Sequence, residues 1–156
     1  MEKEKTIDGL NLLITINNDR IEGYETALKE TEDVELKTLF EQFILTSQKC
    51  IHDLISQVIS LGGVPAEGTI TSVRIFRIWK DARAALKGKD RKAILNLCKN
   101  REVMAKDTYD KVLEDDFVLS NAKLFNLIYS QSSLLNDDHD HINALRAMLL
   151  EVQIAS

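Results

Sequence analysis

Glu22, Glu102 and His139 are the candidate metal-ligating residues of this chain. Carboxylates and imidazoles bind iron, manganese and zinc. A helical bundle holds a pair of such ions with one Glu from each of two helices and a Glu-x-x-His pair from each of the other two. No Glu-x-x-His pair occurs here. The residue types therefore permit metal binding, but they lack the pattern of a di-iron centre.

A single polar layer is predicted where helical counting brings polar residues to one height. Asn17 and Ser47 lie at similar distances before and after the turn at 31–33. Glu102 lies 85 positions after Asn17, and Ser132 lies 85 positions after Ser47. Only one of these four residues is a carboxylate, and Cys50 stands three positions after Ser47. Because buried polar groups must be paired, this composition favours a hydrogen-bonded structural layer over a metal cage.

Asp137-Asp138-His139-Asp140-His141 is the densest group of possible ligands outside that layer. Five consecutive helical residues point all round the axis, so at most two of them face one way. Asp138 and His139 are expected to face inward, and Asp137 and His141 outward. The favoured interpretation is a buried His139 paired with a neighbouring acid, and the alternative is a metal ligand. Asp137 and His141 form an i, i+4 pair that can take a surface metal.

Other common site chemistries lack their residues. Neither Ser47 nor Ser132 has a histidine at the same height, and no glycine-rich phosphate loop is present. The two cysteines, Cys50 and Cys98, lie on apolar helix faces, which predicts buried free thiols and a reducing cytoplasm. We therefore expect a protein that is not an enzyme and has no cofactor, with iron, manganese or zinc as the alternative.

The elements that must position these residues are long helices. Apolar residues recur at helical spacing from Leu10 to Leu28 and again from Leu36 to Leu61, and the short connector at 31–33 predicts an antiparallel hairpin. Thr6 or Asp8 is expected to cap the first helix and Thr31 or Asp33 the second, which should stop at Leu61-Gly62-Gly63.

The second half of the chain repeats this hairpin. A shorter helix is predicted from Val73 to Leu86, then a long helix capped by Asp90, an acidic turn at 114–116 and a fourth long helix. A shift of 85 positions aligns Tyr24 with Tyr109 and Phe40 with Phe125. The prediction is one all-α domain over 1–156, an up-down four-helix bundle with hairpins at 6–62 and 90–153. A long crossover at 63–89 contains the short extra helix.

Charge and hydropathy restrict the partners. The net charge of −5 argues against nucleic acid, and no apolar run reaches the roughly 18–20 residues of a membrane span. The segment Arg74–Lys92 carries eight basic residues and two acidic ones. It is expected to dock on the acidic remainder of the chain, or else on an acidic partner or membrane surface.

Several short stretches resemble a bacterial family of ferritin-like four-helix-bundle proteins known only as a domain of unknown function. They are 17–24 (NNDRIEGY), 61–63 (LGG), 84–90 (AALKGKD), 93–95 (AIL), Glu102, Tyr109 and 139–146 (HDHINALR). The resemblance spans nearly the whole chain and implies a ferritin-like fold but no reaction. It also implies that Glu22, Glu102 and His139 match recurrent polar residues of the family.

The sequence thus predicts a non-enzymatic cytoplasmic bundle that forms homo-oligomers. Loose family analogy adds a stress-related role. Leu127, Leu134 and Leu150 of the fourth helix, or the segment around Trp79, are the candidate dimer faces. The alternative is a degenerate metal-binding bundle that uses Glu22, Glu102 and His139.

Overall fold

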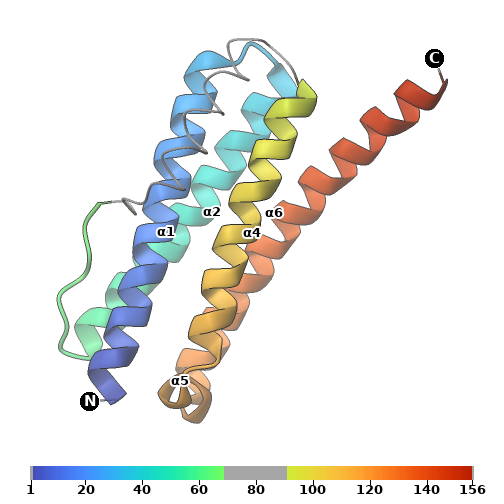
Figure 1. Ribbon diagram of the computed structural model, residues 1–156. Helices are drawn as coiled ribbons and strands as arrows, with labels where there is room; N and C mark the ends of the chain where they lie inside the picture. Colours follow the sequence, from blue (N-terminus) through green and yellow to red (C-terminus); the bar gives the residue numbers. More distant parts are fainter. Residues whose placement is uncertain (1, 69–90, 156) are drawn as a thin grey trace.

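The computed structural model describes residues 2–68 and 91–155, and every regular element among them is a helix. The helices are α1 (Glu2–Glu30), α2 (Val34–Ser60), α4 (Arg91–Leu113), α5 (Asp116–Ser120) and α6 (Ala122–Ala155). Two antiparallel hairpins, α1 with α2 and α4 with α6, lie side by side (Figure 1). The predicted crossover helix and the Asp90 cap lie outside the described residues. None of the described helices is both long and apolar enough to cross a membrane.

The helix ends follow local chemistry. The Asp33 side chain accepts hydrogen bonds from the backbone amides of Glu35 and Leu36, as predicted for a cap. Beyond α2, Gly62 has φ 82°, a conformation that glycine adopts without strain, so the predicted stop is also confirmed. The first helix begins at Glu2 rather than at Thr6 or Asp8, since the preceding Glu and Lys residues are themselves good helix formers.

The short helix α5 was not predicted. It follows the acidic turn, where the side chain of Asp115 accepts hydrogen bonds from the amides of Phe117 and Val118. Val118 is fully buried and closes one end of the core. Five residues are too few to show a helical period, so only the capping aspartate marked this element.

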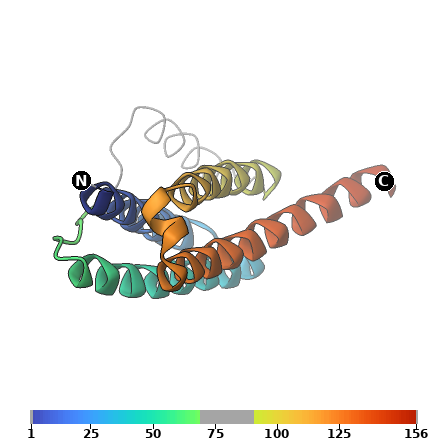
Figure 2. The ribbon, with the colours of Figure 1, turned by 90° about the horizontal axis from the view of Figure 1, so that it is seen from below.

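The core has two apolar clusters, one toward each end of the bundle. One contains Leu13, Leu54 and Tyr109, and the other contains Tyr24, Phe43 and Leu95. Polar side chains from the middle of the long helices lie between the clusters. Toward its C-terminal end, α6 diverges from α4 (Figures 1 and 2).

Candidate functional site

The middle of the bundle holds an arginine that is 1% exposed. The guanidinium of Arg20, from α1, donates from Nε and Nη2 to Oε1 of Glu102 on α4, at 3.1 and 2.9 Å. Nη1 donates to Ser47 Oγ on α2 at 2.5 Å, and Nη2 also donates to Asp138 Oδ2 on α6 at 3.2 Å. All four long helices therefore meet at one guanidinium, and we call this group the arginine layer.

Aromatic side chains complete the arginine layer. The hydroxyl of Tyr24 donates to Glu102 Oε1 at 2.6 Å, so that single oxygen accepts three hydrogen bonds. The guanidinium carbon of Arg20 lies 5.7 Å from the ring centroids of both Tyr24 and Phe43. Burial alone would lower the pKa of Arg20, but Glu102, Tyr24 and Asp138 outweigh it and raise that pKa. Arg20 is therefore a permanent buried cation.

A second polar layer again connects four helices, about one helical turn from the arginine layer on α1 and α2 and about two turns from it on α4 and α6. Asn17 Nδ2 donates to the Tyr109 hydroxyl at 2.9 Å, and that hydroxyl donates to Gln131 Oε1 at 2.8 Å. Gln131 Nε2 donates to the backbone oxygen of Cys50 at 3.2 Å. Burial raises the pKa of Tyr109 well above its ordinary value, so the phenol stays protonated. Nothing in this layer is charged.

Beside the arginine layer, Arg101 of α4 pairs with Asp19 of α1. Arg101 Nη2 lies 2.8 Å from Asp19 Oδ2, and both side chains are buried. The guanidinium carbon of Arg101 also lies 5.6 Å from the Tyr24 ring centroid. The interior between α1 and α4 thus contains two arginine–carboxylate pairs.

The predicted layer of Asn17, Ser47, Glu102 and Ser132 is real in part. All four side chains are buried, but Ser47 and Glu102 belong to the arginine layer and Asn17 to the second layer. Sequence reasoning missed Arg20, although it lies three residues after Asn17 and four before Tyr24, on the same helix face. That spacing was the available signal.

The three residues predicted to bind metal are not gathered together. Glu102 is buried in the arginine layer, His139 is half-buried, and Glu22 is exposed on the outer face of α1. Asp138 faces inward, and Asp137 and His141 outward, as predicted. Among the described residues the buried Nε2 of His139 has no hydrogen-bond partner, so the expected pairing of His139 with an acid is not seen at this atom.

The cysteines are buried free thiols, as predicted. Burial raises the pKa of Cys50 to about 11 and that of Cys98 to about 12. Because the thiolate is the nucleophilic form, neither thiol is activated at neutral pH. These two residues fill space in the core.

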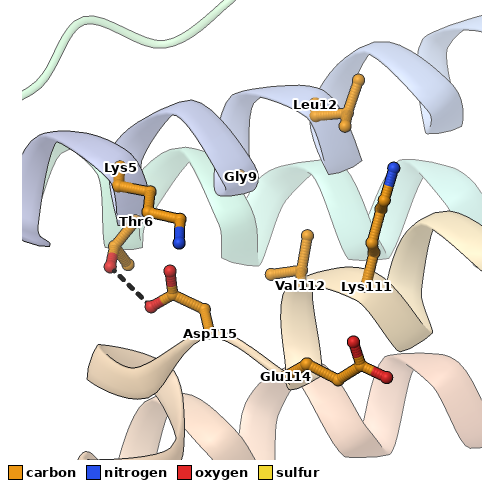
Figure 3. A pocket seen from close by; sticks show the side chains of 8 residues that line it. All are labelled: Lys5, Thr6, Gly9, Leu12, Lys111, Val112, Glu114 and Asp115. Atoms are coloured by element: carbon orange, nitrogen blue, oxygen red, sulfur yellow. Dashed lines mark hydrogen bonds between the residues drawn. The ribbon is translucent and has the colours of Figure 1, made fainter.

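A groove of about 410 Å³ lies between the start of α1 and the end of α4 (Figure 3). Gly9, Leu12 and Val112 give it apolar walls, and Lys5 and Lys111 lie along it. Its Asp115 is engaged, because it caps α5 and accepts a hydrogen bond from Thr6 Oγ1 at 3.1 Å. The groove offers cations beside apolar surface but no assembled catalytic group.

Asp138 makes the folding stability depend on pH. Burial raises its pKa from 3.8 to about 6, with Arg20 opposing and Glu102 adding to the rise. Below about pH 3.8 the protonated group contributes its full stabilisation, which is lost as pH rises to about 6. We expect wild-type stability to fall by about 2 kcal/mol relative to Asp138→Asn between about pH 4.5 and 7, measured by urea unfolding.

Asp137→Asn is the matched control for this measurement, because Asp137 is the exposed neighbour on the same helix. That variant should keep most of the wild-type pH dependence. Equal pH profiles for wild type and Asp138→Asn would contradict the assignment of this titration to Asp138.

Comparisons with known proteins were made for the sequence and for the fold. The sequence profile of a family described as "Domain of unknown function (DUF2383)" matches residues 5–115. No curated protein matches the chain significantly. Among solved structures, a similar one is a crystal structure of ferritin like, diiron-carboxylate proteins from Bacillus anthracis str. Ames. The two structures superpose with a TM-score of 0.69 at 19% sequence identity, and the match covers 96% of this chain and 98% of that chain. The fold of this chain is thus ferritin-like.

The side chains of the arginine layer do not fit a pair of metal ions. Two ions in such a bundle need about six inward-facing oxygens and nitrogens. The arginine layer has two carboxylates, of Glu102 and Asp138, and both are bonded to the guanidinium of Arg20. Among the described residues, no group of three or more His, Cys, Asp or Glu side chains is arranged to hold a metal ion.

Proposed function

The chain belongs to the DUF2383 family, and we propose that it acts without catalysis, as a helical bundle that self-associates in the cytoplasm. The interior supports this proposal because its buried charged side chains pair with one another and do not line an open cavity. Functional contacts are then made by the outer surface. A stress-related role remains an analogy with the fold and rests on no residue described above.

Three exposed apolar residues on one face of α2 carry the proposal. Val34, Leu45 and Ile59 are 76%, 66% and 60% exposed. At 100° per residue they fall within about 40° of one another around the helix axis, and they extend over about 37 Å of its length. The residues between them on this face are polar, which gives the face the mixed composition of a non-obligate protein interface.

The spacing of Val34, Leu45 and Ile59 along α2 suits contact with a second copy of the same chain. In a two-fold symmetric dimer with antiparallel α2 helices, Leu45 lies near the axis and Val34 faces Ile59 of the other copy. The same symmetry places Glu41 opposite His52, so the polar residues between the apolar ones are also compatible. Of the dimer faces predicted on the fourth helix, Leu134 is 37% exposed and Leu127 is half-buried. Trp79 lies outside the described residues.

The test is oligomeric state, measured by light scattering during gel filtration over a wide range of protein concentration. We expect wild type to dimerise and Leu45→Glu to weaken the dimer about 100-fold, because like charges would meet at the axis. Val64→Glu is the control, since Val64 is 82% exposed but lies off α2. A monomeric wild type, or a dimer indifferent to Leu45→Glu, would contradict the proposal.

Metal binding is the second candidate function, and of the predicted set Glu22, Glu102 and His139 it rests on Glu102 and His139, because Glu22 is exposed. One observation favours it: Glu102 Oε2 and His139 Nε2 are buried without a hydrogen-bond partner in the part of the chain that the structure describes. Elemental analysis of protein purified without chelator separates the candidates. Stoichiometric iron, manganese or zinc, lost in Glu102→Ala or His139→Ala, would support this second function.

The basic segment Arg74–Lys92 remains a proposed docking site for an acidic partner. Of its residues only Arg91 and Lys92 are described. Arg91 pairs with Asp33 and Glu35 at the start of α2, so at least one cation of the segment contacts the chain's own acids. The remaining basic residues lie outside the described part of the chain.

A further inference from the structure

Two buried carboxylates from different helices converge on one atom of Arg20. The Nη2 atom lies 2.9 Å from Glu102 Oε1 and 3.2 Å from Asp138 Oδ2. Glu102 is 1% exposed and Asp138 is 3% exposed, so neither carboxylate can exchange this cation for bulk water without movement. Glu102 and Asp138 thus form a site for one cation, and the guanidinium of Arg20 occupies it.

The remaining atoms of the arginine layer show that the guanidinium satisfies this site only in part. Glu102 Oε2 is buried and has no hydrogen-bond partner within residues 2–68 and 91–155, whereas Oε1 of the same carboxylate accepts three hydrogen bonds. The site holds two carboxyl groups but only one singly charged guanidinium. A divalent cation at the same position would neutralise both carboxylates.

We propose that Arg20 is the resident cation of a single-ion site formed by Glu102 and Asp138, so that its guanidinium excludes divalent metal ions from the wild-type chain. A chain without this guanidinium should bind one divalent ion in the space left. Carboxylate oxygens, the Ser47 hydroxyl and water are hard ligands that suit Mn²⁺. This inference concerns the arginine layer alone and does not depend on self-association.

The energetic reason is the cost of buried charge. Carboxylates removed from water without a cation are strongly destabilising, so the folded state of Arg20→Ala gains by binding any cation that fits. Anything that binds the folded state and not the unfolded one raises the thermal midpoint. The proposal therefore has a readout in stability as well as in binding.

The experiment compares wild type, Arg20→Ala and Arg20→Ala/Glu102→Gln in MnCl₂ titrations at neutral pH. Thermal midpoint and bound Mn²⁺ by equilibrium dialysis are both measured. We expect wild type to bind no Mn²⁺ and to keep its midpoint. Arg20→Ala should melt lower, recover several degrees with Mn²⁺ and bind one ion per chain. The double variant should bind Mn²⁺ more weakly by a factor of roughly ten or more.

Two results would overturn the proposal. One is a wild-type chain that binds Mn²⁺ stoichiometrically and loses it in Glu102→Gln. The other is a folded Arg20→Ala whose midpoint ignores Mn²⁺. If Arg20→Ala is unfolded at every Mn²⁺ concentration, Arg20→Gln replaces it, because the longer amide keeps a donor near Glu102. Failure of both variants to respond also refutes the proposal, and none of these readouts measures the oligomeric state.

Discussion

Replacing Arg20 by methionine is expected to lower the free energy of unfolding by about 3–5 kcal/mol. Methionine fills much of the same space, so the loss comes from charge rather than from a large cavity. Glu102 and Asp138 would remain buried with no cation between them, and Ser47 would lose its donor. A typical domain is stable by 5–15 kcal/mol, so this single change removes a large share of the total.

Urea unfolding followed by circular dichroism measures this loss, and the thermal midpoint should fall by roughly 10 °C. Arg91→Met is the matched control. Arg91 also pairs with two carboxylates, of Asp33 and Glu35, but its side chain is 32% exposed. Surface ion pairs contribute about 0–1 kcal/mol, so the control should cost no more than that. Equal losses for the two variants would refute the central place given to Arg20.

The arrangement of the long helices followed from the sequence because helical periodicity is a local property. Apolar residues from Leu10 to Leu28 and from Leu36 to Leu61 define two stripes, and the helix ends at Asp33 and Gly62 carry their own chemistry. These signals depend on neighbours within a few residues. They do not depend on how the hairpins pack together, so the helices can be predicted from the sequence alone.

The polar interior was harder to predict, because counting residues from a turn does not fix which residues of neighbouring helices lie at the same level along the bundle. Counting from a turn placed Asn17 and Glu102 in one layer, but the structure puts them in two separate layers. A difference of three residues is one helical turn, and helix tilt readily introduces it. The inward direction of these residues was predictable, and their partners were not.

Arg20 was missed because a charged residue is ordinarily assigned to the surface. Its burial depends on acids from α4 and α6, which are distant in sequence. Glu22 shows the converse error. It lies two residues from both Arg20 and Tyr24, and two residues correspond to about 200° around a helix, which places it on the outer face. Its acidic type suggested chemistry, but its position excludes it from the layer.

The second large effect is expected from a double-mutant cycle between Arg20 and Glu102. Glu102→Leu alone should cost about 3–5 kcal/mol, since it removes the main partner of a buried cation and the acceptor of the Tyr24 hydroxyl. Arg20→Met/Glu102→Leu should cost less than the sum of the two single changes, by roughly 2–3 kcal/mol.

The reason is that an apolar pair at a buried position needs no compensation, whereas each single variant leaves a charge without its partner. In the double variant the remaining acid, Asp138, loses the Arg20 charge that lowers its pKa and the weaker opposing effect of Glu102, so it takes up a proton more readily than in the wild type. Arg91→Met/Glu35→Leu, at the exposed pair, provides the control cycle and should show coupling below about 1 kcal/mol. Additive losses at Arg20 and Glu102 would mean that the two side chains stabilise the bundle separately, through packing, and that their ion pair does not hold α1 to α4.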